Sequence, residues 1–291
     1  MYKILKSEEI AANVFLMDIE APRVAKSCMP GQFVICKTGE EGERIPLTIC
    51  DYDRQKGSVT IIFQAVGAST EMMSKLKTGD YMTDFTGPLG KPSDLVELSD
   101  DELAKKKVLF VAGGIGAAPV YPQVKYFHDH NVSCDVILGS RTKELMILEK
   151  ELKETAGNLY VCTDDGSYGI PGRVTDVINK LVREDKKEYD ACVAIGPMIM
   201  MKFVCQLTKE LNIPTTVSLN PIMVDGTGMC GACRVSIGDK MQFACVDGPE
   251  FDGFLVDFDE AMKRQTMYRE KEKEARDKYH QCCGKCKKEE A

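Results

Sequence analysis

The chain has 291 residues, which is longer than one typical domain and predicts two or three compact units. Its composition, with 44% hydrophobic and 29% charged residues, is typical of a soluble globular protein. The net charge of -7 argues against nucleic acid as the main partner, because binding to phosphate backbones needs a concentrated basic surface.

The N-terminus, MYKILKSEEIAANVF, carries Glu8 and Glu9 where a signal peptide would have its apolar run. The longest apolar stretch, VLFVAGGIGAAPVY, is too short and too rich in glycine to span a bilayer. We therefore expect a cytoplasmic protein without a membrane segment.

Residues 1–103 show short runs rich in Val, Ile, Phe and Thr, separated by turn signals. The runs are NVFLMDIE, GQFVICKT, RIPLTICDYD, GSVTIIFQAV and GDYMTDFTGPLG. This spacing predicts an antiparallel β-barrel or sandwich as the first domain.

Within this first unit, RIPLTICD places Arg44 and Thr48 around a Pro-Leu turn, and the loop QAVGAST begins sixteen residues after Thr48. An arginine beside a loop of Gly, Ala, Ser and Thr offers both charge and backbone donors to a phosphate. A hairpin with an incidental arginine explains the same residues, and this part of the sequence does not separate the two interpretations.

Residues 104–220, which include the end of the charged segment SDDELAKKK, show a different sequence pattern. Buried strands alternate with amphipathic helices, which predicts right-handed βαβ units around a parallel sheet. In VLFVAGGIGAAP, Gly113, Gly114 and Gly116 allow a pyrophosphate to approach the backbone at a helix N-terminus. The full G-x-G-x-x-G fingerprint is absent, so a purely structural turn is the alternative.

Three further strand ends in this unit carry Gly, Ser, Asp or Arg: LGSRTKE, TDDGSYG and AIGPMIM. In open parallel sheets, ligands bind outside the carboxyl ends of the strands, so these segments favour a nucleotide site. The alternative makes Arg141 a surface charge and Asp164 and Asp165 solvated turn formers.

Residues 221–258 form a segment dense in Gly and Cys, with the sequence DGTGMCGACRVSIGDKMQFAC at its centre. Cys230, Cys233 and Cys245 are soft ligands that suit an iron–sulfur cluster or zinc. In plant-type C-x4-C-x2-C spacing the first ligand position falls on Asp225, which would give a [2Fe–2S] cluster a carboxylate oxygen. Asp225 as a plain turn former and a zinc knuckle are the alternatives.

The tail, residues 259–291, mixes both signs of charge at helical spacing and predicts an exposed helix with a frayed end. Its HQCCGKC sequence has residue types that bind metals, but a terminus without core residues does not favour a native metal site. The cysteines outside the cluster segment and the tail are expected as small core residues, since cytosolic thiols stay reduced. They are Cys28, Cys36, Cys50, Cys134, Cys162, Cys192 and Cys205.

Taken in order, the R-x-P-L-T and G-x-S-T loops, the GGIGAAP turn and the cysteine segment resemble the ferredoxin–NADP reductase superfamily. Within it, they are similar to the branch that contains the electron-transfer subunits of dihydroorotate dehydrogenase. The resemblance covers residues 1 to about 258. It implies FAD on the barrel, NAD(H) on the second domain and a [2Fe–2S] cluster on the third.

Carried over residue by residue, the resemblance assigns three sets of candidate ligands. For FAD these are Arg44, Pro46, Leu47, Thr48, Ile62, Phe63, Gln64, Gly67, Ser69 and Thr70, with Thr48 as the candidate catalytic residue. For the nicotinamide nucleotide they are Gly113, Gly114, Gly116, Arg141, Asp165 and Gly196. For the cluster they are Asp225, Cys230, Cys233 and Cys245.

The dihydroorotate subunits hold their cluster with four cysteines, and this sequence departs from them at Asp225. Three cysteines and an aspartate instead resemble the small subunits of electron-bifurcating NADH-dependent reduced ferredoxin:NADP oxidoreductases. That resemblance implies a larger, glutamate-synthase-like partner subunit that reduces NADP, and ferredoxin as an acceptor. Two alternatives stay open: a dihydroorotate-oxidising system, and a zinc or interaction module without flavin.

Overall fold

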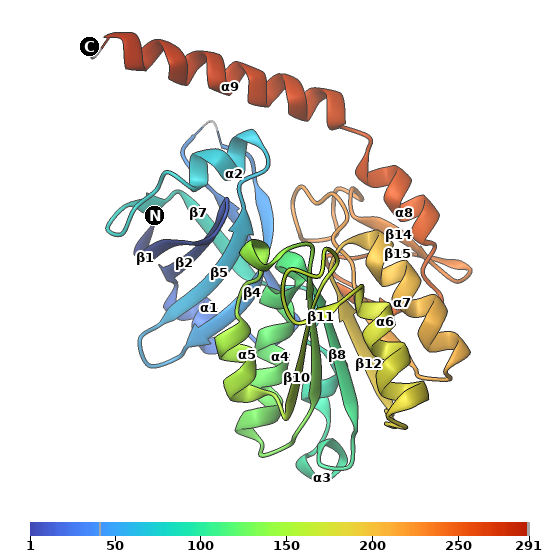
Figure 1. Ribbon diagram of the computed structural model, residues 1–291. Helices are drawn as coiled ribbons and strands as arrows, with labels where there is room; N and C mark the ends of the chain where they lie inside the picture. The colour runs from blue at the N-terminus through green and yellow to red at the C-terminus, as the bar shows by residue number, and fades with distance from the viewer. Residues whose placement is uncertain (41, 290–291) are drawn as a thin grey trace.

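The computed structural model describes residues 1–40 and 42–289, and the side chains of residues 1–40 and 42–281. The barrel, the parallel sheet and the cysteine segment follow one another along the chain, and a long helix extends from the last of them (Figure 1). Within the described residues, no helix is long and apolar enough to cross a membrane.

The first domain is an antiparallel sheet of seven strands in the order β6-β1-β2-β5-β4-β3-β7, curled into a near-closed barrel. Buried Val, Ile, Phe and Met side chains such as Ile61, Phe63 and Phe85 fill its interior. The strands are β1 (Tyr2–Ala11), β2 (Val14–Glu20), β3 (Phe33–Lys37), β4 (Ile45–Asp53), β5 (Ser58–Gln64), β6 (Tyr81–Met82) and β7 (Asp84–Leu89), with helices α1 (Pro22–Ser27) and α2 (Ala68–Met73). The predicted antiparallel barrel is confirmed.

The second domain is a seven-stranded sheet in the order β11-β10-β9-β8-β12-β13-β16, parallel except for β16. Its strands are β8 (Val108–Gly113), β9 (Asp135–Ser140), β10 (Asn158–Thr163), β11 (Ile170–Pro171), β12 (Ala191–Ile195), β13 (Thr215–Ser218) and β16 (Glu250–Asp252). Because β8 is buried along its whole length, its run VLFVAG has no polar alternation. The predicted parallel sheet is confirmed.

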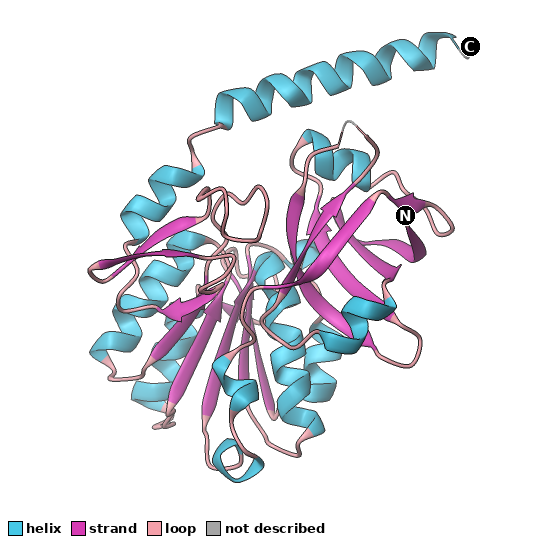
Figure 2. Ribbon diagram, turned by 180° about the vertical axis from the view of Figure 1, so that it is seen from behind, coloured by secondary structure: helices cyan, strands magenta, loops and turns pink. Residues whose placement is uncertain are grey.

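Helices cover both faces of this parallel sheet (Figure 2). The buried residues of α4 (Ala117–Asp129) and α5 (Glu149–Thr155) pack on one face, and those of α6 (Val174–Asn179) and α7 (Met198–Glu210) pack on the other. Short helical turns η1 (Asp94–Glu97), α3 (Asp100–Leu103), η2 (Gly114–Gly116), η3 (Lys143–Leu145) and η4 (Lys180–Glu184) complete the connections.

The cysteine segment contains a hairpin of β14 (Arg234–Ile237) and β15 (Lys240–Phe243), and then returns to the parallel sheet as β16. This return was not predicted, since Glu250–Asp252 is too short a run to carry a periodicity. Helix α8 (Phe258–Gln265) then packs near β14 and α7. Strand β16 therefore joins the cysteine segment to the parallel sheet of the second domain.

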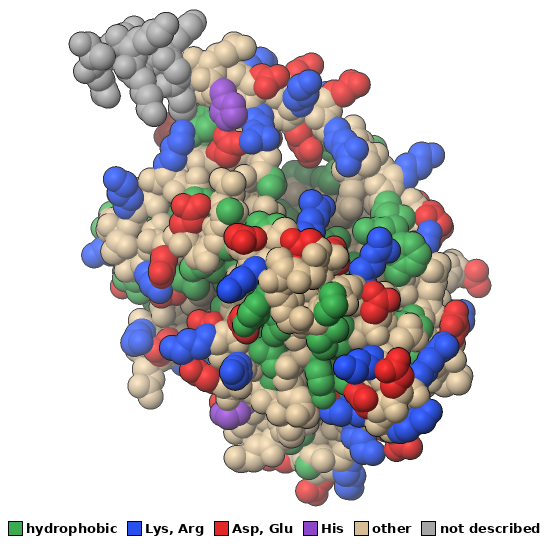
Figure 3. Space-filling view, in the orientation of Figure 1, with side chains coloured by type: hydrophobic (Ala, Val, Ile, Leu, Met, Phe, Trp, Pro, Cys, Tyr) green, Lys and Arg blue, Asp and Glu red, His purple; other side chains and the backbone are tan. Residues whose placement is uncertain are grey.

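Helix α9 (Arg269–Glu289) occupies most of the charged tail and crosses above the barrel to α2. There Glu71 accepts from Arg276, with Oε1 2.7 Å from Nε, and from His280, with Oε2 2.6 Å from Nε2. Positive and negative side chains are interspersed along the visible face of the tail (Figure 3). The tail cysteines Cys282, Cys283 and Cys286 lie outside the residues whose side chains are described.

Seven cysteines in the two larger domains are buried and unpaired, as predicted for small core residues. Burial raises the pKa of several of these thiols, for example that of Cys162 to about 12. All seven pack among hydrophobic core side chains and lie outside the cysteine segment, so we assign them no ligand role.

Candidate functional site

The barrel side of the site is built on β4 and β5, where most of the predicted flavin residues lie. Arg44 precedes β4 and donates from Nη1 to Oδ2 of Asp84 at 2.7 Å. Pro46, Leu47 and Thr48 follow on β4, with Thr48 opposite Phe33 of β3. The ion pair with Asp84 therefore fixes the guanidinium beside this strand, in place for an anionic or carbonyl group.

On β5 the side chains of Ile62 and Phe63 point into packed interiors. Phe63 is buried in the barrel and stacks on Phe15, with ring centroids 5.7 Å apart, and Ile62 packs with residues of the nucleotide domain. Gln64 is exposed at the end of the strand. Ile62 and Phe63 can border a ring through their backbone, whereas Gln64 can do so through its side chain.

The predicted pyrophosphate loop, residues 65–70, is held by its own hydroxyl groups. Thr70 Oγ1 accepts from the N–H groups of Val66 and Gly67, both at 3.0 Å. Ser69 donates to Oε2 of Glu43 at 3.1 Å. A phosphate bound here would take the place of the Glu43 carboxylate as the acceptor for Ser69.

On the second domain, the predicted nucleotide residues gather at the carboxyl ends of β8, β9, β10 and β12. Gly113, Gly116 and Gly196 sit where β8 and β12 approach each other closely: a Cβ on Gly116 would clash with the carbonyl of Ile195. Gly114 differs, because its φ is +55° and no described atom lies within 4 Å of its Cβ position. Packing explains three of these glycines, whereas the left-handed backbone explains Gly114, which has open space beside it.

Arg141 and Asp165 meet at the same edge of the sheet. The Asp165 N–H donates to the Arg141 carbonyl at 3.2 Å, and the Asp165 Oδ1 accepts from the Ser167 N–H at 2.9 Å. Hydrogen bonds from Ser167 lower the pKa of Asp165. The carboxylate is exposed and ionised near neutral pH, which suits hydroxyl groups better than a phosphate.

The third candidate site is the cysteine loop, by which we mean residues 225–233 together with Cys245 after the hairpin. Cys233 and Cys245 are buried with their Sγ atoms 3.1 Å apart, whereas Cys230 is exposed. Burial, together with Cys233, raises the pKa of the Cys245 thiol to about 12, so this thiol is protonated without a metal. A bound cation would displace its proton and hold Cys233 and Cys245 as thiolates.

Asp225 accepts two backbone hydrogen bonds in this loop. Its Oδ1 is 2.7 Å from the Thr227 nitrogen and its Oδ2 is 3.0 Å from the Cys230 nitrogen. The Thr227 bond leads the causes that lower the pKa of Asp225. In the described part of the chain, no three His, Cys, Asp or Glu side chains meet as a ready metal group, and among the thiols of the predicted ligands only those of Cys233 and Cys245 are in contact.

The loop chemistry nevertheless fits an iron–sulfur cluster. Gly226, Gly228 and Gly231 all have positive φ, which lets the chain wrap tightly around a compact group. Three thiols and one carboxylate are available within this loop and its hairpin. Such soft donors suit iron bound to sulfide.

The cysteine loop lies against β3 and β7 of the barrel. A Cβ on Gly226 would stand 2.9 Å from Cδ1 of Leu89 on β7 and 3.0 Å from Cγ1 of Ile35 on β3. Ile35 in turn pairs with Pro46 across the β3–β4 ladder. The loop with Asp225 is thus one strand away from the predicted flavin residues, a relationship that the sequence did not reveal.

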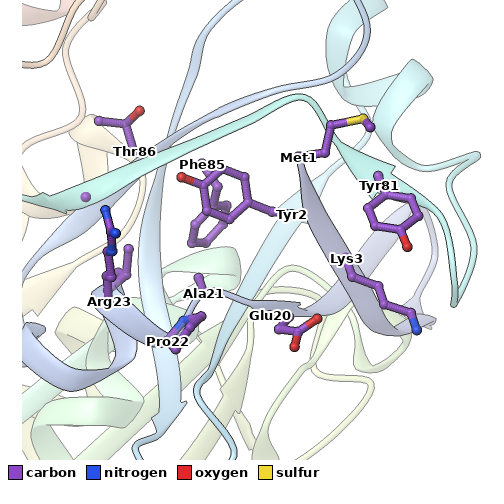
Figure 4. A pocket seen from close by; sticks show the side chains of 12 residues that line it. Met1, Tyr2, Lys3, Glu20, Ala21, Pro22, Arg23, Tyr81, Phe85 and Thr86 are labelled. Carbon is purple, nitrogen blue, oxygen red and sulfur yellow. The ribbon is translucent and has the colours of Figure 1, made fainter.

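A pocket of about 550 Å³ on the barrel lies apart from all of these residues. It is lined by β1, β6, β7 and the start of α1, with Tyr2, Arg23 and Tyr81 around it (Figure 4). None of the predicted site residues is among those lining it. We assign it no role in the site.

The fold and the site together define an oxidoreductase with a reductase barrel, an NAD-binding domain and an iron–sulfur domain. Residues 110–206 match the family model of the oxidoreductase NAD-binding domain. Residues 220–257 match that of the iron–sulfur cluster binding domain of dihydroorotate dehydrogenase B. These matches bear out NAD(H) and an iron–sulfur cluster as cofactors, and the reductase barrel adds FAD.

The relatives narrow this class to one family. The chain is 45% identical to a homologue of the electron transfer subunit of dihydroorotate dehydrogenase B from Thermotoga maritima, over 97% of this chain and 96% of that protein. It is 61% identical to an uncharacterized protein from Clostridium beijerinckii, over 94% and 93% of the two chains. The chain belongs to the family of dihydroorotate dehydrogenase B electron transfer subunits.

One solved structure is similar along almost the whole chain. It belongs to an NADH-dependent reduced ferredoxin-NADP oxidoreductase studied for flavin-based electron bifurcation. Identity is 44%, the TM-score is 0.88, and the match covers 96% of this chain and 98% of that one. Both resemblances drawn from the motifs are therefore confirmed.

Proposed function

We propose that the chain is the small subunit of an electron-bifurcating NADH-dependent reduced ferredoxin:NADP oxidoreductase. The observation that carries this proposal is the contact of the cysteine loop with the barrel, where Gly226 packs on Ile35 and Leu89. It supports a short route for electrons from β4, which carries Thr48, to the loop that carries Asp225. The similarity to the solved oxidoreductase over both chains supports the same activity.

The proposed roles follow the three parts of the site. FAD supplies the step between two-electron hydride exchange with NAD(H) and one-electron exchange with a cluster. Arg44, Pro46, Leu47 and Thr48 hold the flavin on β4, Ile62, Phe63 and Gln64 border it on β5, and Gly67, Ser69 and Thr70 bind its pyrophosphate. Thr48 offers the hydroxyl group beside the reacting ring. No acid–base pair is required, because aligning the rings is the main task of the protein.

On the nucleotide side, Gly114 leaves room for the backbone of the turn to meet the pyrophosphate of NAD(H). Gly113, Gly116 and Gly196 keep β8 and β12 close enough for that turn to form, and Arg141 and Asp165 border the nucleotide. Asp225, Cys230, Cys233 and Cys245 hold the [2Fe–2S] cluster. An electron that reaches the cluster needs an acceptor, so we propose a larger, glutamate-synthase-like subunit that reduces NADP, and ferredoxin as a second acceptor.

The test is the stoichiometry of the anaerobically purified complex. It should oxidise NADPH while reducing NAD and ferredoxin together, and omitting either acceptor should stop the reduction of the other. Ferredoxin reduction that proceeds equally well without NAD would contradict bifurcation.

Electron transfer for dihydroorotate oxidation is the second candidate, because the matching family model and the T. maritima relative carry that name. Affinity purification of this chain from its native cells separates the two. Recovery of an orotate-forming flavoprotein would favour dihydroorotate oxidation, and recovery of a larger NADP-reducing flavoprotein would favour bifurcation.

A further inference from the structure

Glu250 occupies the point where all three domains meet. It is the first residue of β16 and pairs with Ser218 of β13, which ties it to the parallel sheet. It follows Cys245 by five residues in the sequence. The proposed functions of the three cofactor sites make no use of this carboxylate.

A chain of side-chain hydrogen bonds joins the domains at Glu250. Gln123 of α4 donates from Nε2 to Oε1 of Glu250 at 2.6 Å. Ser93, in the segment that leaves the barrel, donates to Oε1 of Gln123 at 3.2 Å. Gln123 is 0% exposed and Ser93 is 1% exposed, so water does not replace these bonds without opening the junction.

Backbone hydrogen bonds lie beside this series of side-chain hydrogen bonds. The Lys91 N–H donates to the Gly248 carbonyl at 2.7 Å, and the Leu219 N–H donates to the Pro249 carbonyl at 2.9 Å. A Cβ on Gly90 would be 2.9 Å from Cδ of Pro249. The segment just before Glu250 is therefore packed between the barrel and the parallel sheet.

The same barrel segment also touches the cysteine loop. Leu89 contacts Gly226, and Gly90 and Lys91 contact the residues just before Glu250. Any shift of β16 relative to the barrel would thus alter how the cysteine loop lies on β3 and β7. The rate of electron transfer depends steeply on the distance between the two cofactors, which this placement of the loop on the barrel sets.

We propose that Glu250 is a positioning residue that, through Gln123 and Ser93, holds the cysteine loop against the barrel, and that ionisation of its carboxyl group weakens this junction. The inference rests on the proposed electron transfer between FAD and the cluster. Glu250 itself does not touch the reacting groups.

Charge and burial give the direction of the effect. Desolvation of the half-buried Glu250 raises its pKa to about 7, against the hydrogen bond from Gln123 that lowers it, and the nearby Asp94 raises it further. Asp94 is the charged group that acts on Glu250 from the barrel segment, whereas α4 contributes the neutral Gln123 and β13 the neutral Ser218.

The sign of the linkage follows from that raised pKa. The closed junction keeps its proton up to about pH 7, whereas an opened and hydrated carboxyl releases it near its ordinary value of 4.5. The ratio of open to closed junctions therefore rises roughly tenfold per pH unit between these two pKa values. Above the higher value the ratio stays constant.

Hydrogen exchange on the intact complex tests the junction. After correction for intrinsic rates, the segments 89–93 and 245–250 should open more readily as the pH rises from about 5.5 to about 7, with a plateau above. Glu250→Gln keeps an acceptor for Gln123 but cannot ionise. The opening equilibrium of this variant should therefore not change with pH across this range. Asp94→Asn should move the plateau to lower pH. A flat wild-type profile, or an unchanged profile in Glu250→Gln, overturns the proposal.

The rate of cluster reduction by NADH tests the positioning role. Glu250→Ala leaves Gln123 without its acceptor and should slow reduction several-fold, and Glu250→Gln should restore it. If Glu250→Ala opens the junction but reduces the cluster at the wild-type rate, the positioning role is wrong. If the wild-type cluster takes no electrons from NADH at all, the proposed function fails, and the exchange profiles still decide whether ionisation opens the junction.

Discussion

The carboxylate of Asp225 accepts a hydrogen bond from the backbone N–H of Cys230, with Oδ2 3.0 Å from the nitrogen. The residue proposed as the fourth cluster ligand thus already shapes the loop that carries the second. A ligand role and a turn role are compatible, because a carboxylate oxygen has lone pairs for both a cation and an N–H donor.

Replacement of Asp225 with Cys separates the two roles. If Asp225 is a ligand, Asp225→Cys keeps a [2Fe–2S] cluster with four thiolates, and the electron paramagnetic resonance spectrum and the reduction potential both change. Iron content per chain should stay near that of the wild type. An unchanged spectrum and potential would leave Asp225 as a turn residue only.

Cys245 and Cys162 form a matched pair of buried thiols. Cys245 lies 3.1 Å from Cys233, whereas Cys162 belongs to the core of the parallel sheet. Cys245→Ala should lose most of the bound iron and sulfide, because a cluster ligand is gone, while Cys162→Ala should keep both. Iron and sulfide analysis of anaerobically purified protein measures the difference, and equal losses in the two variants would contradict the assignment.

Gly114 tests the nucleotide site against a control glycine that also has a positive φ. Gly114 and Gly79 both have positive φ, and neither has a described atom within 4 Å of its Cβ position. Alanine at either place should cost about 1 kcal/mol of stability, since the left-handed backbone disfavours a side chain. We expect only Gly114→Ala to weaken NADH binding, measured by calorimetric titration. Equal NADH affinity in both variants would place the nucleotide elsewhere.

Asp135 should make the stability of the nucleotide domain depend on acid pH. Its side chain is 11% exposed and accepts from Lys187 Nζ at 2.6 Å and from the Tyr189 hydroxyl at 2.7 Å. Burial alone raises the pKa of Asp135, but the hydrogen bonds from Lys187, Asn158 and Tyr189 outweigh it and lower that pKa.

A lowered folded-state pKa means that this stabilisation is present above the ordinary value of 3.8 and is lost as the pH falls through the folded-state value. Asp135→Asn should therefore cost about 1–3 kcal/mol at neutral pH and less in acid. Thermal unfolding at several pH values measures this, with Asp185→Asn at an exposed site as the control. A constant difference between wild type and Asp135→Asn down to the acid limit would contradict the linkage.

The sequence alone determined the features that local patterns encode. Strand runs with turn signals predicted the antiparallel barrel, alternation of strands and helices predicted the parallel sheet, and the spacing of Cys230, Cys233 and Cys245 predicted an iron–sulfur domain. Each depends on residues close together in the chain. The resemblance of these motifs to a known family supplied the remaining site residues.

Only the tertiary structure decided the contacts between distant segments. Gly226 on Ile35 and Leu89, Glu43 beside Ser69, and the junction of Ser93, Gln123 and Glu250 each join residues far apart in the sequence. Nothing in the local pattern around Glu250 marks it, because an exposed strand end and a buried junction can have the same sequence. Its importance arises from burial and from partners that the folded chain brings to it.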